Sequence, residues 1–225
     1  MMRTVLACLL LSLAAGASGR TGRVGPEKPF QPDLMALVNG KGGAVVNRTI
    51  SAIQDGAKKG IRLDEKPDQG LAWFDGFDFG DGAIEFDVKG KNVPQQSFVG
   101  VAFHGIKGGP FDVIYFRPFN FKSDDPARRA HGVQYVSEPD YPWQKLRAQH
   151  PGVYEKAVTP PPDPDGWFHA RIVVASPKIS VFVNESKEPS LVVEKLNERR
   201  RGSVGLWVGY GSGGDFANLK IIPND

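Results

Sequence analysis

The feature that most constrains this chain is a two-residue alternation of apolar and polar side chains in short segments. Within residues 83–89, Ile84, Phe86 and Val88 are separated by charged residues, and within residues 97–104 Val99, Val101 and Phe103 again recur at every second position. Successive side chains of a strand point to opposite faces, so this period predicts half-buried β-strands. Clusters of Gly, Pro, Asp and Asn separate the segments and predict turns. The predicted strands cover residues 43–46, 60–64, 70–74, 83–89, 97–104, 111–121, 131–136, 167–175, 178–184, 190–193, 202–209 and 215–222.

Many short strands joined by turns predict an all-β fold, an antiparallel two-sheet jelly-roll sandwich. A length of 225 residues suits one such domain, and 27 Gly with 18 Pro supply the turns. Only residues 142–149 and 194–200 offer a helical turn or two. One face of each sheet packs inward in a sandwich. The outer, concave face of one sheet is therefore free to carry polar and aromatic side chains for a ligand.

The N-terminal residues have the pattern of a signal peptide. Arg3 precedes the apolar run 5–13, which is too short to span a membrane, and small residues at 15–17 resemble a cleavage site. We therefore divide the chain into a signal peptide (1–19), an extended, proline-containing linker (20–37) and one jelly-roll domain (38–225). The mature chain is expected to be exported, to the periplasm or the extracellular space, and to have no transmembrane segment.

Charge and cysteine content exclude several classes of protein. The net charge is +3, with 28 basic and 25 acidic residues mixed along the chain, which argues against a nucleic-acid partner. The lone Cys8 lies in the signal peptide, so the mature chain has no disulfide or cysteine metal site. The histidines show no metal-ligand spacing with one another. The one metal that the sequence allows is a structural Ca²⁺ held by aspartates near Gly-rich turns, namely Asp75, Asp78, Asp81 and Asp215.

The first candidate binding segment is the aromatic stretch 111–121. If it is one strand, Tyr115 and Arg117 share a face, and Asn120 follows near its end. Aromatic rings stack on the apolar face of a sugar, while arginine and amide groups hydrogen-bond its hydroxyls. These residues are candidates for carbohydrate binding. The alternative, weighed equally, is an edge of the core where Arg117 forms an ion pair.

A second candidate segment begins at residue 131 and continues into a proline-rich loop. Long loops without regular structure are often functional. We expect this region to contribute further substrate-binding groups, although Trp143 alone could serve only to anchor the loop to the core. The candidates are Gln134, Tyr135, Trp143, Arg147 and Glu155.

Three residues are candidates for acid–base chemistry. His104 ends a predicted strand, Asp112 lies early in the aromatic segment, and Glu155 follows the long loop. Histidine and carboxylate groups are the usual general acids and bases. The alternative for His104 is a hydrogen-bonded structural residue, which is the commoner role of a histidine at a strand end.

The strand 83–89 allows a specific test for a retaining glycosidase. In concanavalin-like members, the catalytic carboxylates lie on one strand face in an E-x-D-x-x-E or E-x-D-x-E pattern. Glu85 and Asp87 match its beginning, but the third carboxylate is missing in either spacing. We therefore interpret this pair as the solvated face of an ordinary strand.

Four segments resemble concanavalin A-like lectin/glucanase jelly rolls, whose closing strand is also shared with laminin G-like domains. The resemblance covers residues 38–222 and is strongest to bacterial secreted proteins of the 3-keto-disaccharide hydrolase (DUF1080) group. It implies a jelly roll of two antiparallel sheets and, in the hydrolase group, cleavage of 3-keto-glycosides. The segments are 82–90, 97–105, 115–121 and 202–219.

These observations lead to two main hypotheses of function. The first is a secreted carbohydrate-active domain, a hydrolase of glycosides or 3-keto-glycosides, in which Glu155 or Asp112 acts as acid or base with His104. Arg117 and Gln134 would then orient the sugar, and Trp143 would stack on it. The alternative is a non-catalytic, lectin-like binding or surface interaction module. A third class, a structural protein without a ligand, predicts that the aromatic residues of 111–121 are all buried.

Overall fold

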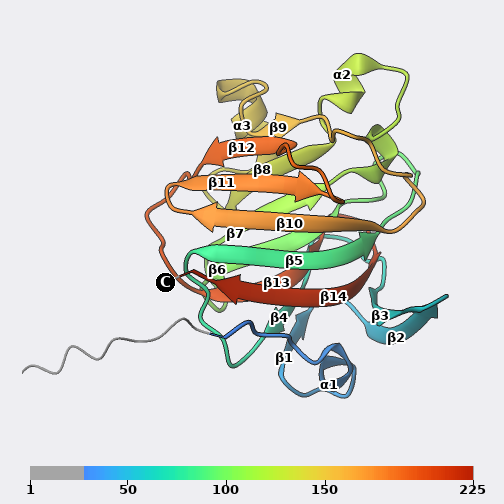
Figure 1. The fold of residues 1–225 in the computed structure, drawn as a ribbon, viewed down its shortest axis with the longest axis vertical. Coiled ribbons are helices and arrows are strands. Elements are labelled where there is room, and N and C mark those ends of the chain that lie inside the picture. The colour runs from blue at the N-terminus through green and yellow to red at the C-terminus, as the bar shows by residue number, and fades with distance from the viewer. Residues whose placement is uncertain (1–27, 225) are drawn as a thin grey trace, which may run out of the picture.

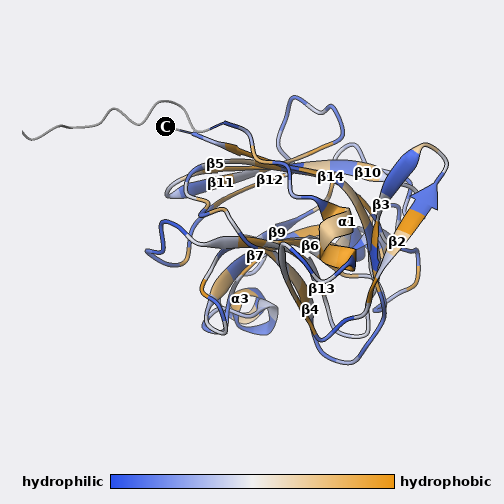
Figure 2. Ribbon diagram, turned by 90° about the horizontal axis from the view of Figure 1, so that it is seen from below, coloured by the Kyte–Doolittle hydropathy of each residue, from blue (hydrophilic) through white to orange (hydrophobic). Residues whose placement is uncertain are grey.

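The computed structural model describes residues 28–224, which form two antiparallel β-sheets packed face to face (Figures 1 and 2). We call the first the front sheet. In spatial order its strands are β1 (Gly43–Val46), β4 (Gly70–Phe74), β13 (Ser203–Val208), β6 (Val99–Gly105), β7 (Phe111–Phe116), β8 (Val133–Glu138) and β9 (Glu155–Lys156).

The second sheet, which we call the back sheet, also has seven strands in the described part of the chain. In spatial order they are β12 (Leu191–Glu194), β11 (Lys178–Val183), β10 (Phe168–Ala175), β5 (Gly82–Lys89), β14 (Gly214–Pro223), β3 (Lys58–Leu63) and β2 (Ile50–Asp55). Every strand pair is antiparallel, so the predicted all-β, two-sheet antiparallel sandwich is confirmed.

The main core lies between the two sheets, where the predicted alternation places it. Ile84, Phe86 and Val88 of β5 are fully buried there against the inward side chains of β6. The strand period of two thus decides which residues form the core.

One residue breaks the alternation, and this changes its surroundings. His104 was expected to share the outer face of β6 with Ala102, but its backbone is left-handed, with φ of 48°. Its ring is fully buried instead, 5.6 Å from the ring of Phe79 in the main core. A non-glycine residue in this region is uncommon, and here it ends the regular part of the strand.

A second apolar layer covers the outer face of the front sheet. It contains Val113, Val136 and Trp207 from three strands, together with Leu146 of α3 (Trp143–Gln149). Figure 2 shows α3 against the front sheet on the side away from the back sheet. This helix, predicted from residues 142–149, closes one side of the surface that carries the candidate site.

Several elements differ from the sequence prediction. The strand expected over 111–121 ends at Phe116, because Pro118 lacks the N–H that a strand needs and begins a 3₁₀ turn, η1 (Pro118–Asn120). No helix forms over 194–200. Strand β2 and the short helix α2 (Pro126–Arg129), which Asp125 caps, have no counterpart among the expected elements.

The segment before the sandwich also differs from the expected extended linker. Residues 34–38 form helix α1 (Leu34–Val38), because the Asp33 side chain accepts hydrogen bonds from the first turn. Phe30 bridges Ile221 of the last strand. The expected signal peptide, 1–19, and residues 20–27 lie outside the described part. No helix among the described residues is long and apolar enough to cross a membrane.

Candidate functional site

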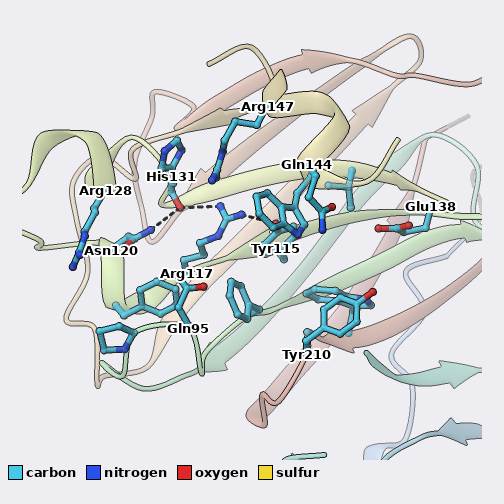
Figure 3. Close-up of a pocket in the computed structure, with 17 residues that line it drawn as sticks. Gln95, Tyr115, Arg117, Asn120, Arg128, His131, Glu138, Gln144, Arg147 and Tyr210 are labelled. Atoms are coloured by element: carbon cyan, nitrogen blue, oxygen red, sulfur yellow. Dashed lines mark hydrogen bonds between the residues drawn. The ribbon is translucent and has the colours of Figure 1, made fainter. Parts of the chain in front are cut away.

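A pocket of about 580 Å³ opens on the outer face of the front sheet (Figure 3). Its volume falls within the range of ligand pockets, roughly 300–1,000 Å³. Its walls come from β7, β8, β13, η1 and α3 and from the loops before β6 and after β13. The lining residues are Pro94, Gln95, Phe98, Tyr115, Arg117, Phe119, Asn120, Arg128, His131, Val136, Glu138, Trp143, Gln144, Arg147, Trp207, Gly209 and Tyr210.

A row of register partners runs from the pocket wall to the groups behind it. Tyr115 on β7 pairs with Gln134 on β8, which pairs with Glu155 on β9. On the other side of Tyr115, Gly100 of β6 carries no side chain, so the rings of Tyr115 and Trp207 approach to 5.0 Å between centroids. Neighbouring side chains on one sheet face interact directly. The strand register therefore assembles an aromatic and polar site from distant parts of the sequence.

Arg117 is the central buried cation of this site. Its guanidinium donates to the hydroxyl of Tyr115 at 2.6 Å, to the side-chain oxygen of Gln134, and to the backbone carbonyl of His131 at 3.1 Å. Its charged carbon lies 4.8 Å from the centre of the Tyr115 ring. Burial in this setting raises the pKa of Tyr115 to about 12, so the phenol stays neutral. Arg117 is thereby fixed in one orientation at the pocket wall.

Glu155 is a buried carboxylate held by cations. Arg147 donates to both of its oxygens, at 2.9 and 2.7 Å, and the nearest nitrogen of Arg117 lies 3.6 Å away. Burial alone would raise the pKa of Glu155, but the hydrogen bonds from Arg147 and the charges of His131 and Arg117 outweigh it and hold the pKa below its usual value. Glu155 is therefore ionised at neutral pH and cannot act as an acid there.

His131 stands between this carboxylate and the pocket. Its Nδ1 lies 2.8 Å from an oxygen of Glu155, as a close charge contact without the alignment of a hydrogen bond. Its Nε2 has no hydrogen-bond partner in the part of the chain that the structure describes. Burial lowers the pKa of His131, only partly offset by the charge of Glu155, so the neutral ring predominates at pH 7. A neutral imidazole beside a carboxylate can accept a proton.

The opposite end of the pocket carries a different carboxyl group, that of Glu138. Figure 3 shows it directed into the pocket toward Tyr115 and Gln144, with Tyr210 on the same side and His131 at the far end. It makes no hydrogen bond or ion pair within the described chain, and burial alone raises its pKa. Glu138 lines the pocket and Glu155 lies behind it, and their surroundings shift the pKa values of the two carboxyl groups in opposite directions.

Aromatic rings form much of the remaining wall. Trp143 is 36% exposed and its ring lies 4.9 Å below the charged carbon of Arg147. Phe98 lies edge-on to Tyr115 and Phe119. Tyr210 is 58% exposed at the rim. Such faces are suited to stacking on sugar rings.

The predicted site residues divide into three groups. Tyr115, Arg117, Asn120, Trp143 and Arg147 line the pocket. Gln134 and Glu155 lie directly behind it and hold the arginines. His104, Asp112 and Tyr135 lie elsewhere, on the inner side of the front sheet.

That last group forms an interior charged cluster, not part of the pocket. Asp112 is fully buried and accepts hydrogen bonds from Tyr135, Asn197 and Arg199, at 2.9, 2.6 and 3.0 Å. Burial would raise the pKa of Asp112, but the charges of Arg199 and Lys195 and the hydrogen bond from Tyr135 hold it low. The side chains of Asp112 and Tyr135 point inward because they share a face with core residues, opposite to Tyr115 and Gln134.

His104 takes part in the same cluster. Its Nε2 lies 3.0 Å from the carbonyl of Gly80, and its Nδ1 lies 2.7 Å from Lys195. A charged lysine donates, so Nδ1 is the acceptor in this contact. The expected grouping of His104 and Asp112 with Glu155 therefore does not form, because the sheet separates them. These contacts match the structural role weighed for His104.

Several pocket residues were missed as site candidates, among them the titratable His131 and Glu138. His131 was considered only as a metal ligand, and its link to Arg117 runs through a backbone carbonyl that no sequence pattern reveals. Glu138 had a usable signal, because it lies four positions after Gln134 on one strand and so shares its face. The aromatic residues of 111–121 are all buried, yet Tyr115 and Phe119 line the pocket, so their burial does not identify a structural protein without a ligand.

Three of the four aspartates considered for Ca²⁺ bind protein groups. Asp215 forms a two-pronged pair with Arg62, Asp78 binds Arg201, and Asp81 accepts from Ser176. Within residues 28–224, no group of three or more His, Cys, Asp or Glu side chains is placed to hold a metal ion. Asp87, expected on a solvated face, is only 7% exposed, because His169, Lys58 and Asn218 all contact its carboxylate.

The two-sheet sandwich has the fold of concanavalin A-like domains, with a pocket on the outer face of the front sheet. Residues 33–222 match the family described as the 3-keto-alpha-glucoside-1,2-lyase-like domain, and the chain belongs to that family. No curated protein matches the chain in sequence.

Solved structures of low sequence identity share the fold. The carbohydrate binding module CBM66 from Bacillus subtilis superposes with a TM-score of 0.57 at 13% identity, covering 80% of this chain and 95% of that one. A protein with a galectin-like fold from Bacillus subtilis gives 0.57 at 11% identity, covering 88% and 99%. The metal-free exoplasmic/lumenal domain of VIP36 gives 0.54 at 12% identity, covering 82% and 85%.

Proposed function

We propose that this protein binds a 3-keto-glycoside in the front-sheet pocket and cleaves its glycosidic bond, with His131 as the base. The observation that carries the proposal is the contact of 2.8 Å between His131 Nδ1 and the buried, ionised Glu155, at the edge of an aromatic pocket. A base held by a carboxylate inside a ligand-sized pocket is an arrangement that favours proton transfer. The family description, a 1,2-lyase of 3-keto-α-glucosides, supplies the substrate class.

The chemistry follows from the ketone at C3. A neighbouring carbonyl acidifies the C–H bond at C2, so a neutral histidine can take that proton at Nε2. The electron pair of the C–H bond then forms the C1–C2 double bond, and the leaving group departs from C1 with the pair of the glycosidic bond. The leaving oxygen takes a proton from the protonated His131 or from water. Addition of water to the double bond completes a net hydrolysis.

The arginines support this step by their charge. Negative charge develops on the ketone oxygen as C2 loses its proton, and fixed cations in a site shielded from water stabilise such charge. Arg117 is locked by Tyr115 and Gln134, and Arg147 is locked by Glu155. In this scheme Glu155 is a positioning residue, since it acts through His131 and the arginines.

The test compares turnover of 3-keto-glucosides with that of the parent glucosides. We expect cleavage of the keto compounds only, and His131→Gln should lower kcat by about 100-fold or more. His150→Gln is the matched control, since His150 follows α3 and does not line the pocket. Absence of cleavage by the wild-type chain, or full activity in His131→Gln, would overturn the proposal.

The second candidate is a binding module without catalysis. It is favoured by Glu155, whose two oxygens are both committed to Arg147, so that no carboxyl group beside His131 is free to donate a proton. This module would bind glycosides without changing them. Measured affinity in the absence of any turnover, with Arg117→Ala and Trp143→Ala both weakening it, would support the module over the enzyme.

We also propose that the protein is exported. The support is the pattern of residues 1–19 and the absence of cysteine from the rest of the chain. Expression of the full chain in a bacterium, followed by fractionation and N-terminal sequencing, tests this. A mature protein outside the cytoplasm that begins shortly after residue 17 is expected. An uncleaved cytoplasmic protein would contradict it.

A further inference from the structure

We propose that the Glu138 end of the pocket is a subsite for a protonated amine, so that the preferred ligand is a glycoside with an amino sugar as its second unit. This inference rests on the proposed function only for the location of the first sugar unit. It concerns a part of the pocket that the proposed chemistry does not use.

The first argument is the position of the two ends. Val133 and Glu138 are five residues apart on β8, a distance of about 17 Å along a strand. His131, Arg147 and Asn120 lie at one end of the pocket in Figure 3, and Glu138 and Tyr210 lie at the other. A single pyranose ring cannot contact both ends. The pocket has room for a second unit beside Glu138.

The second argument is the distribution of charge. The His131 end contains the cations of Arg117, Arg147 and Arg128, with Glu155 already bound by Arg147. Glu138 has no cation near it within the described chain. A partly buried carboxylate without a partner is unfavourable, and a ligand cation would supply the missing charge. The pocket is therefore complementary to a ligand that carries a positive group only on its second unit.

The third argument is the nature of the walls beside Glu138. Tyr210 and Tyr115 lie close enough to Glu138 for its charge to help raise their pKa values, after the larger effect of burial. Trp207 packs on Tyr115 and lines the same pocket. Ammonium groups bind well where a carboxylate and aromatic faces meet. A ligand with only hydroxyl groups at this position would not require the negative charge of Glu138.

The experiment measures binding of three matched ligands to the wild-type chain at low salt. They are the methyl glycosides, in both anomeric forms, of glucosamine, glucose and N-acetylglucosamine, which differ only at C2. We expect the glucosamine compounds to bind about tenfold more tightly than the other two, because only they carry an ammonium group. The preference should weaken as salt is added.

Two variants test whether Glu138 is the source of the preference for the amine. In Glu138→Gln the preference for the amine, measured as the ratio of the glucosamine and glucose affinities of that same variant, should fall to about one. Glu188→Gln removes a carboxylate from an exposed back-sheet loop and should keep the full preference. Equal binding of all three compounds by the wild-type chain, or an undiminished preference in Glu138→Gln, would overturn the inference.

The result of this binding experiment can be told apart from the result of the cleavage test for the proposed reaction. Cleavage of 3-keto-glucosides without any preference for an amine removes this subsite and leaves the reaction in place. Amine binding that depends on Glu138, in a protein that cleaves no keto sugar, removes the reaction and leaves the subsite.

Discussion

The outer faces of the two sheets both carry charged groups but arrange them differently. On the back sheet, opposite charges pair across the outer face, and their lysine and arginine side chains remain partly in water. On the front sheet, Arg117 and Glu155 are buried under aromatic rings, α3 and loops. The back-sheet pairs are Lys89–Asp55, Arg171–Glu85, Arg62–Asp215 and Lys58–Asp87.

The difference shows what makes a sheet face into a candidate site. Strand register brings charges together on both faces. Only the front sheet has a covering layer that excludes water, and this raises the cost of each unpaired charge and the strength of each pair. The back sheet is therefore a stabilised surface, whereas the front sheet has a pocket with fixed groups. The following predictions test this contrast.

The largest expected effect is on the buried carboxylate. Glu155→Gln leaves the cations of Arg117 and Arg147 without their counter-charge and should lower the free energy of unfolding by about 3–5 kcal/mol. Glu85→Gln breaks the partly exposed pair with Arg171 and should cost no more than about 1 kcal/mol. Urea unfolding of both variants measures this. Equal costs would mean that the two faces do not differ.

The ionisation of Glu155 also makes the free energy of unfolding depend on pH, in a direction that its pKa shift determines. The folded-state pKa of Glu155 lies below its unfolded value of 4.5. Its stabilising effect is therefore complete above that value and is lost as the pH falls through the folded-state pKa. The difference in unfolding free energy between wild type and Glu155→Gln should be constant from pH 8 to about pH 5.5 and shrink below about pH 4.5. A difference that grows on acidification would contradict the assignment.

The interior cluster tests whether burial of charge alone makes a site. Asp112→Asn weakens hydrogen bonds from Tyr135, Asn197 and Arg199 and should lower the free energy of unfolding by about 2 kcal/mol. Ligand affinity and turnover should stay within a factor of two of wild type, about 0.4 kcal/mol. A selective loss of activity in a stably folded variant would return Asp112 to the list of catalytic candidates.

An effect on binding is expected at the pocket rim. Trp143→Ala removes an exposed ring that stacks with Arg147 and should weaken glycoside binding by about tenfold. Val192→Ala, at a half-exposed position of the back sheet, is the control and should leave affinity unchanged. Calorimetric titration of both variants gives the answer. Equal affinities would remove Trp143 from the binding surface.

The smallest expected effect concerns the second pocket carboxyl. Burial raises the pKa of Glu138, so its ionised form is less stable in the folded protein than in the unfolded chain. This penalty is absent below the unfolded-state pKa and appears as the pH rises. Glu138→Gln should therefore increase the free energy of unfolding at pH 8, by less than about 1 kcal/mol. At pH 4 the two proteins should be equal, and a destabilised variant at pH 8 would show that Glu138 has a partner.

The sequence predicts the sandwich well because strand alternation is a local property. It also places Tyr115 and Arg117 together, since side chains two residues apart in extended backbone point the same way, and Arg117 directly follows the end of β7. It does not predict which strands become neighbours, and so the row Tyr115, Gln134, Glu155 is not visible before the register is known. Tyr135 was a candidate because tyrosine suits sugar binding. Its position between Gln134 and Val136, which face outward, turns its side chain inward instead.

His104 and His131 show a second limit. The left-handed backbone of His104 turns its ring away from the face that alternation predicts. His131 precedes its strand, where alternation no longer applies, and its importance comes from contacts with Glu155 and Arg117. Conformations at strand ends depend on tertiary packing, and residues there are the hardest to assign from sequence.

The pairing of Phe30 with Ile221 has a consequence for chain connectivity. Two backbone hydrogen bonds of 2.8 Å hold these residues side by side, so the start and end of the described fold are neighbours. A short linker could join residues 28 and 224 without crossing the sandwich. New ends could then be opened in the exposed loop 184–188, on the back sheet and away from the pocket. Such a circularly permuted protein should fold with its pocket intact, since chain order is not what holds the two sheets together.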